Sequence, residues 1–210
     1  MKILSDIEST LKYLKELRKS TYSNILTSGN GFFEKDYSVE EYVKKIMDLT
    51  KLNGDDFLFE LSSKLDDEQF GNLQISEKEL KNSVDRITKE ERNILENTIS
   101  RIENFQKKTL IKNWFDEKNG YGEYIKPIKS VGCYIPGGTA PLISTVLHTV
   151  IPAKVAGVKR ISIASPAAGI ELPNNMLLAA AYLSGVDDFY TYGGPQAIIS
   201  MAVGTKKVSK

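Results

Sequence analysis

The placement of proline and glycine is the feature that most constrains how this chain of 210 residues can fold. All seven prolines and ten of the fifteen glycines follow residue 120, whereas charged residues are dense before it. Proline and glycine end helices and form turns. We therefore expect a mainly helical N-terminal segment over residues 1–120 and an α/β part over residues 121–210.

Helix-start signals recur in the first segment. Ser38 and Glu41, Ser76 and Glu79, and Thr88 and Glu91 each have the spacing of a capping box, in which a hydroxyl and a carboxylate satisfy each other's free backbone N–H groups. Apolar residues also recur at steps of three and four, as one face of a helix requires. They are Ile3, Leu4, Ile7, Leu11, Leu14 and Leu17, and later Leu95, Ile99, Ile102 and Phe105.

The second part alternates between strand and helix patterns. Strands are predicted over 130–135, 160–164 and 188–192, and helices over 141–156, 174–183 and 196–203. Thr139 is a candidate N-cap, and Pro141 is suited to the first turn of its helix. This order implies parallel strands joined by right-handed crossovers. The sequence thus predicts an α/β fold with the start of a Rossmann-like parallel sheet built from βα units.

Two glycine turns follow predicted strands and precede predicted helices. The first is Pro136-Gly137-Gly138 and the second is Gly193-Gly194, with Gln196 just beyond it. Free N–H groups and the helix dipole at such a point favour anions, and open α/β sheets bind ligands at the carboxyl ends of their strands. Neither turn is a G-x-G-x-x-G or Walker A motif. A plain tight turn therefore remains the alternative to a binding site.

Composition narrows the class of partner. Lysine plus arginine number 28 against 27 for aspartate plus glutamate, which weighs against a nucleic-acid partner. No apolar run reaches membrane-spanning length, and the first residues lack the apolar core of a signal peptide. One cysteine, Cys133, cannot form an internal disulfide, and the single histidine, His148, has no neighbouring metal ligands in sequence. We expect a cytoplasmic protein.

Five blocks in the second part resemble consecutive blocks of the histidinol dehydrogenase family, in the family's order and spacing. They are Val131-Gly-Cys-Tyr-Ile-Pro-Gly-Gly-Thr-Ala-Pro-Leu142, Ser144-Thr-Val-Leu147, Ile151-Pro-Ala-Lys-Val-Ala-Gly-Val158, Leu178-Ala-Ala-Ala-Tyr-Leu183 and Gly193-Gly-Pro-Gln-Ala197. The resemblance implies NAD-dependent oxidation of L-histidinol to L-histidine in histidine biosynthesis, with bound zinc. It also implies a homodimer, and the open edge of a parallel sheet that stops early favours association through exposed edges.

The resemblance assigns cofactor-binding roles to residues of this sequence. Tyr134 and Gln196 match the family's NAD contacts, and Pro136, Gly137, Gly138, Gly193 and Gly194 match the turns that shape the cofactor site. Pro195 stands where the family commonly has alanine. No catalytic or zinc-binding residue is assigned, because the family's catalytic pair and zinc ligands belong to blocks expected after Lys210. The sheet is therefore expected to be incomplete, with the family's C-terminal half absent and the chain inactive alone.

Two other functions stay open at this point. One is a non-catalytic truncated paralogue that binds a nucleotide or a protein partner. The other is an enzyme similar to aldehyde dehydrogenases, which needs a reactive cysteine loop. Cys133 lies within a predicted strand, and a packed thiol without a cationic neighbour is inert.

Overall fold

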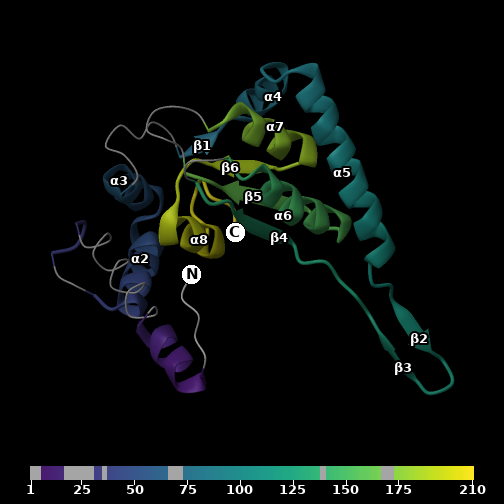
Figure 1. Cartoon of the computed structure of the whole chain (residues 1–210), viewed down its shortest axis with the longest axis horizontal. Coiled ribbons are helices and arrows are strands. Elements are labelled where there is room, and N and C mark those ends of the chain that lie inside the picture. Colours follow the sequence, from purple (N-terminus) through teal and green to yellow (C-terminus); the bar gives the residue numbers. More distant parts are fainter. Residues whose placement is uncertain (1–5, 17–30, 35–36, 66–72, 138–140, 167–172) are drawn as a thin grey trace.

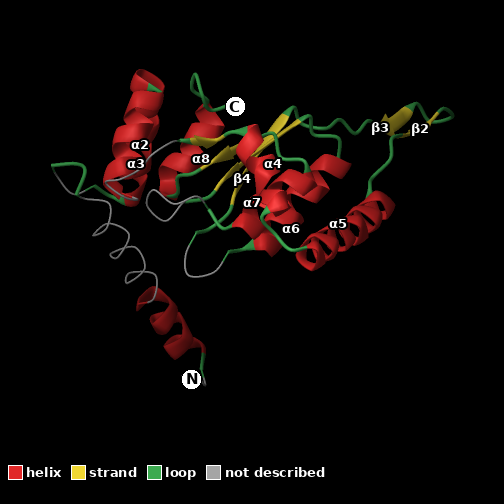
Figure 2. Cartoon of the chain, turned by 90° about the horizontal axis from the view of Figure 1, so that it is seen from above, coloured by secondary structure: helices red, strands yellow, loops and turns green. Residues whose placement is uncertain are grey.

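A computed structural model describes residues 6–16, 31–34, 37–65, 73–137, 141–166 and 173–210. Its first helix covers 7–16 and lies outside the sheet and the helices that cover it (Figures 1 and 2). The predicted apolar stripe on this helix is exposed, with Ile7 at 80% of its full accessibility and Leu11 and Leu14 at 53%. The helical pattern is therefore present, but its apolar face lacks a covering surface in the described structure.

Four further helices precede the α/β part. They are α2 (Val39–Asn53), α3 (Asp55–Leu65), α4 (Glu77–Asp85) and α5 (Lys89–Thr109). Complete capping boxes begin α2 at Ser38 and α5 at Thr88. At α4 the Ser76 hydroxyl accepts the Glu79 N–H, but the Glu79 carboxylate pairs with Arg86. The third predicted box is therefore only half formed, because the carboxylate has a cationic partner.

A four-stranded sheet forms the centre of the fold. Parallel strands β4 (Ser130–Tyr134), β5 (Arg160–Ala164) and β6 (Asp188–Tyr190) confirm the α/β prediction. The short strand β1 (Gln74–Ile75) lies antiparallel on β6, so the sheet order is β1-β6-β5-β4. The sequence patterns did not indicate β1, because two residues are too few to show an alternating pattern.

Helices cover both faces of the sheet (Figures 1 and 2). On one face, α6 (Ile143–Val155) and α7 (Asn175–Ser184) pack on Cys133, Ile163 and Phe189. On the other face lies α8 (Gly194–Val203), which is followed outward by α2 and α3. A Cβ atom on Gly132 would lie 2.7 Å from the Met201 sulfur, so glycine allows α8 to approach β4 closely.

The helical segment and the α/β part share one core. Leu80, Val84 and Leu95 of α4 and α5 belong to the same buried cluster as Ile135 and Leu178. Burial of such side chains contributes about 25 cal/mol for each Å² of apolar surface removed from water. The predicted segments at 1–120 and 121–210 are thus joined by packing as well as by sequence.

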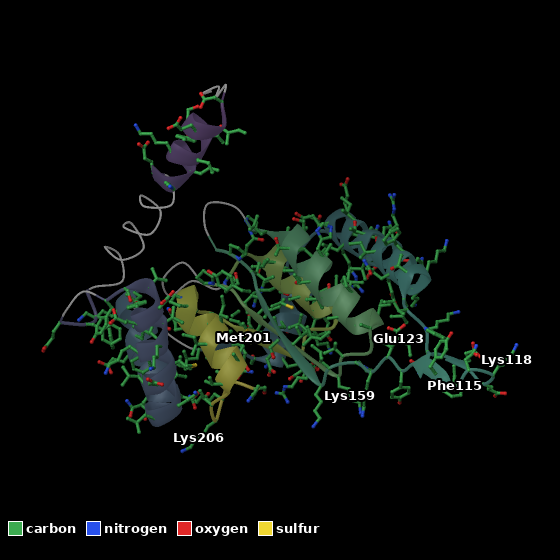
Figure 3. The ribbon with its side chains drawn as sticks, turned by 90° about the horizontal axis from the view of Figure 1, so that it is seen from below. Phe115, Lys118, Glu123, Lys159, Met201 and Lys206 are labelled. Atoms are coloured by element: carbon green, nitrogen blue, oxygen red, sulfur yellow. The ribbon has the colours of Figure 1, made fainter. Side chains whose placement is uncertain are left out.

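A hairpin arm was not predicted. Strands β2 (Trp114–Asp116) and β3 (Tyr121–Glu123) pair antiparallel and extend away from the sheet (Figures 1 and 3). Its aromatic rings are exposed, with Trp114 at 51% and Phe115 at 67%. An isolated two-stranded hairpin is marginally stable in water, so the arm is a surface that a packing partner would stabilise.

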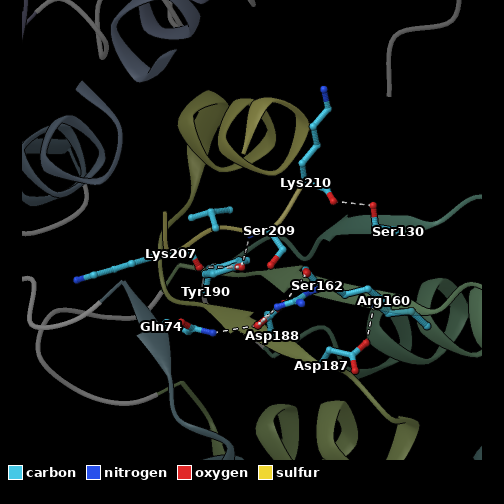
Figure 4. Close-up of polar contacts among 12 residues, drawn as sticks. Gln74, Ser130, Arg160, Ser162, Asp187, Asp188, Tyr190, Lys207, Ser209 and Lys210 are labelled. Atoms are coloured by element: carbon cyan, nitrogen blue, oxygen red, sulfur yellow. Dashed lines mark hydrogen bonds and ion pairs between the residues drawn. The ribbon is translucent and has the colours of Figure 1, made fainter. Parts of the chain in front are cut away.

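The amino ends of the strands are held by a polar cluster around Asp188 (Figure 4). The buried carboxylate accepts hydrogen bonds from Arg160 Nε at 2.9 Å and Nη2 at 3.2 Å. It also accepts bonds from Ser162 Oγ and Gln74 Nε2, each at 3.1 Å. One side chain thus links β1, β5 and β6.

Replacing Asp188 with alanine should lower the free energy of unfolding by about 2–3 kcal/mol, because it leaves the buried Ser162 hydroxyl and the part-buried Gln74 and Arg160 donors without their acceptor. Urea unfolding followed by circular dichroism measures the change. Glu96→Ala, which removes the exposed Arg92–Glu96 pair, is the control and should leave stability nearly unchanged. Equal effects from the two variants would contradict a structural role for Asp188.

Candidate functional site

The turns after all three parallel strands meet at Pro166. Pro166 follows β5, and a Cβ atom on Gly137 would lie 2.3 Å from the Pro166 Cγ. A Cβ atom on Gly193 would lie 3.0 Å from the same ring. The structure therefore brings the two predicted glycine turns together at the carboxyl edge of the sheet. Both glycines therefore have a packing role against Pro166. No sequence motif had predicted that Pro166 would contact them.

The second glycine turn begins helix α8. Gly193 is the N-cap and Gly194 has φ of 63°, a left-handed conformation that glycine adopts without strain. Pro195 lies in the first turn, where its missing N–H removes no helical hydrogen bond. The departure from the family pattern at Pro195 is therefore compatible with the helix start.

The Gln196 side chain is buried, which no pattern in the sequence had predicted. Its side chain is only 1% exposed, and its Oε1 atom has no hydrogen-bond partner among the residues that the structure describes. A Cβ atom on Gly194 would lie 2.6 Å from this oxygen. Buried acceptors are nearly always paired in folded proteins, so Oε1 is an acceptor available to a ligand donor.

Tyr134 ends β4 on the same face of the sheet as α8. Its half-buried ring packs against the cluster that contains Ala197, Met201 and Tyr190. Pro136 and Gly137 follow it at the exposed edge. Of the predicted cofactor-binding residues, Gly138 lies outside the described residues, and the others cluster at or beside the carboxyl ends of β4 and β6.

The start of α6 differs from the prediction. The helix begins at Ile143, with Leu142 as an N-cap that makes no side-chain hydrogen bond. Pro141 therefore precedes the helix instead of occupying its first turn, and Thr139 lies outside the described residues. Because apolar Leu142 offers no capping oxygen, the first N–H groups of this helix have no side-chain acceptor among the described residues, but the helix does not begin directly after Gly137 as expected.

Other reactive side chains have ordinary surroundings. Cys133 is buried, and burial raises the pKa of its thiol, which disfavours the nucleophilic thiolate. His148 lies exposed on α6. Within the part of the chain that the structure describes, no three His, Cys, Asp or Glu side chains form a group that could hold a metal ion.

Comparison with known proteins identifies the family. A family profile described as histidinol dehydrogenase matches residues 33–210. The chain belongs to the histidinol dehydrogenase family. It is 38% identical to the histidinol dehydrogenase of Prochlorococcus marinus subsp. pastoris, over 97% of this chain and 47% of that relative. It is 35% identical to the Aquifex aeolicus protein, over 94% of this chain and 47% of that relative.

A solved structure supports the same relationship. Histidinol dehydrogenase from Elizabethkingia anophelis superposes with a TM-score of 0.77 at 29% identity, covering 84% of this chain and 42% of that one. The chain thus spans about half the length of the histidinol dehydrogenases that it matches. Histidinol dehydrogenases are oxidoreductases, and the α/β sheet described above is the part of that fold present here.

A buried tyrosine forms a hydrogen bond to the second half of α8. The Ser200 hydroxyl donates to the Ala197 carbonyl at 2.9 Å, so its oxygen is free to accept the Tyr192 O–H, 2.8 Å away. Burial raises the pKa of Tyr192. Tyr190 lies beside it and its pKa is also raised by burial. Burial thus keeps both hydroxyls protonated in the folded state at pH values above the ordinary pKa of tyrosine.

This arrangement predicts alkaline destabilisation. Because the folded-state pKa exceeds the unfolded value of about 10, the stabilisation is complete below about pH 10 and is lost as pH rises beyond it. Tyr192→Phe should reduce stability at neutral pH but make the alkaline loss shallower, as urea titrations across this range would measure. The control Tyr121→Phe, on the exposed arm, should keep the wild-type slope. An unchanged slope in Tyr192→Phe would contradict the assignment.

Proposed function

We propose that this chain forms the dinucleotide-binding part of a histidinol dehydrogenase, which oxidises L-histidinol to L-histidine with NAD⁺ in histidine biosynthesis. The observation that carries the proposal is the buried, unpartnered Oε1 of Gln196 at the start of α8. It lies in the chain's Gly193-Gly-Pro-Gln-Ala197 block, and the family match makes NAD the ligand to test.

The residues present fit a dinucleotide. NAD⁺ carries amide, amino and hydroxyl donors, any of which suits the Gln196 acceptor. Tyr134 offers a half-buried ring on the same face, and the start of α8 favours negative charge through its dipole. When bound, NAD⁺ supplies the hydride acceptor. The task of this chain is to bind and orient the dinucleotide, which is the usual protein contribution in cofactor enzymes.

The proposal includes zinc and proton-transfer groups only because membership of the family implies them. The described residues provide no metal-binding group, so we assign no step to zinc in this chain. L-Histidinol contacts and catalytic residues are likewise proposed to lie in the half of the relatives that the chain does not match. We accordingly propose that the chain alone binds NAD⁺ without turning over L-histidinol.

The cellular location and the oligomeric state of the protein are also proposed from the family. No helix in the described residues is long and apolar enough to cross a membrane. A cytoplasmic biosynthetic enzyme that forms a homodimer or associates through exposed edges is the proposed context. The second candidate is a non-catalytic paralogue that binds a nucleotide or a protein, and the exposed aromatic rings of the hairpin arm are the observation that favours a protein partner.

Replacing Gln196 with leucine tests the cofactor site. The variant should weaken NAD⁺ binding about tenfold, since one hydrogen bond to a buried acceptor is lost, and should raise the free energy of unfolding by about 1 kcal/mol. Isothermal titration calorimetry and urea unfolding measure the two effects. Ser62→Ala removes the other buried unpartnered oxygen in α3, so it should stabilise the protein without changing NAD⁺ affinity. Unchanged affinity in Gln196→Leu would reject the assigned contact.

An assay of L-histidinol turnover distinguishes both candidate functions from that of a complete enzyme. Purified chain with L-histidinol, NAD⁺ and zinc should produce no NADH absorbance in the near ultraviolet, because the catalytic groups are proposed to lie in the half of the relatives that this chain does not match. NAD⁺ binding without turnover supports the dinucleotide-binding part, whereas neither binding nor turnover supports the non-catalytic protein-binding paralogue. Zinc-dependent NADH formation would show that the chain contains a catalytic site of its own.

A further inference from the structure

The first helix of the chain has a well-defined start but exposes its apolar face. The Asp6 carboxylate accepts the Ser9 N–H at 2.7 Å, which satisfies one of the free donors at the helix start. The helix then covers only residues 7–16. Isolated helices shorter than about 12–15 residues are marginal in water, and helices in proteins are stabilised mainly by packing of an apolar face. Helix 7–16 therefore needs a surface on which to pack.

Three exposed side chains form the apolar face of this helix. Ile7, Leu11 and Leu14 follow one another at steps of four and three residues, so they lie on one side of the helix. All three are more than half exposed. This spacing is the one by which an amphipathic helix inserts its anchors into an apolar groove of a partner.

A groove of matching character lies at the foot of the hairpin arm. It has a volume of about 540 Å³ and lies between the end of α5, the segment that follows β3 and the last turns of α6. Its lining is mainly aliphatic and includes Leu110, Ile125, Ile128, Pro152 and Val155. Leu110 is 45% exposed and Ile128 is 62% exposed. Contiguous apolar surface of this kind marks an interaction site.

The charges beside the groove complement those at the start of the helix. Lys126 is the charged residue among those that line the groove. Three further lysines are next to lining residues in the sequence, and they are Lys108, Lys112 and Lys129. Asp6 and Glu8 place negative charge at the first turn of helix 7–16. Because opposite charges at the rim of an interface favour one orientation, the first turn of the helix should lie toward the lysines.

The helix and the groove belong to different sides of one chain. Helix 7–16 lies on the side of α2, whereas the groove lies on the side of the hairpin arm (Figures 1 and 2). We propose that the helix of one copy docks in the groove of a second copy, while the second copy's helix docks in the groove of the first. Two equivalent contacts of this kind satisfy two-fold symmetry. The homodimer proposed from the family names no contact, whereas this inference assigns both surfaces.

Analytical ultracentrifugation of the whole chain tests the contact. The unmodified chain should sediment as a dimer that dissociates on dilution. Leu11→Lys removes the central anchor and keeps a residue of high helix propensity, and Ile128→Lys places a charge in the groove. Each substitution changes both contacts of a homodimer. Each variant should therefore associate about 100-fold more weakly, about tenfold for each contact, because a charge would have to be buried against apolar side chains.

Two matched substitutions away from these surfaces should leave association unchanged. Glu16→Gln changes the net charge by the same amount as Leu11→Lys, on the opposite side of the helix. Leu52→Lys makes the same replacement as Leu11→Lys at a residue of α2 that is 78% exposed. At concentrations where the unmodified chain is monomeric, all four variants should unfold at its urea midpoint, because each changes a surface residue.

Mixing the two weakened variants distinguishes helix-in-groove docking from other contacts. A Leu11→Lys chain keeps an intact groove and an Ile128→Lys chain keeps an intact helix, so a mixed dimer contains one intact contact. The mixture should associate about tenfold more tightly than either variant alone, because one of the two tenfold losses is removed. This gain would also show that both variants are folded. A mixture that associates no more tightly than its components would overturn the proposal.

Three other outcomes would also overturn it. An unmodified chain that stays monomeric at every concentration would reject docking between copies. Full association of Ile128→Lys together with loss in Leu11→Lys would assign the helix to another surface. Full association of both variants would place the dimer contact elsewhere. NAD⁺ titration of the same samples tests the proposed function separately, because neither Leu11 nor Ile128 belongs to the proposed dinucleotide site.

Discussion

The buried Asp188 carboxylate is the interaction on which the arrangement of the sheet depends. Three strands meet at it through Arg160, Ser162 and Gln74. A buried carboxylate is costly unless its lone pairs are occupied, so the strands can close around Asp188 only in the register that supplies all of these donors. This requirement fixes β1, from the helical segment, to the edge of β6. The carboxyl ends of the strands, where the candidate site lies, are consequently aligned.

Close packing at the opposite end of the sheet determines the shape of the site. Gly132 lets Met201 approach β4, and Gly137 and Gly193 let two turns contact the ring of Pro166. Each of these glycines is required by protein packing before any ligand is considered. The ligand argument therefore rests mainly on Gln196, whose buried oxygen has no such packing or hydrogen-bonding explanation. Glycine-rich turns identify where a site can form, whereas an unpaired buried acceptor indicates what kind of group it needs.

The features that sequence could predict are those set by local chemistry. The capping residues Ser38 and Thr88 specify their helices, and the apolar runs at 130–135 and 160–164 specify buried strands. The start of α6 was predicted too early, at Pro141, because the helix begins after Leu142, whose apolar side chain gives no capping signal in the sequence. Strand β1 and the Pro166 contacts join residues that are distant in sequence. Burial of Gln196 is likewise a tertiary property, since glutamine at a helix start is usually exposed.

Two surfaces of the described structure lack a packing or pairing partner within the chain, and the physical reason differs between them. The hairpin arm exposes aromatic side chains. Their exposure to water is unfavourable, but it specifies no direction for a partner. The edge of β4 exposes alternating backbone donors and acceptors, which specify both the spacing and the direction of an added strand. An apolar surface alone could accept many partners. The geometry of the β4 edge is more selective, because its regularly spaced donors and acceptors match the backbone of an extended segment.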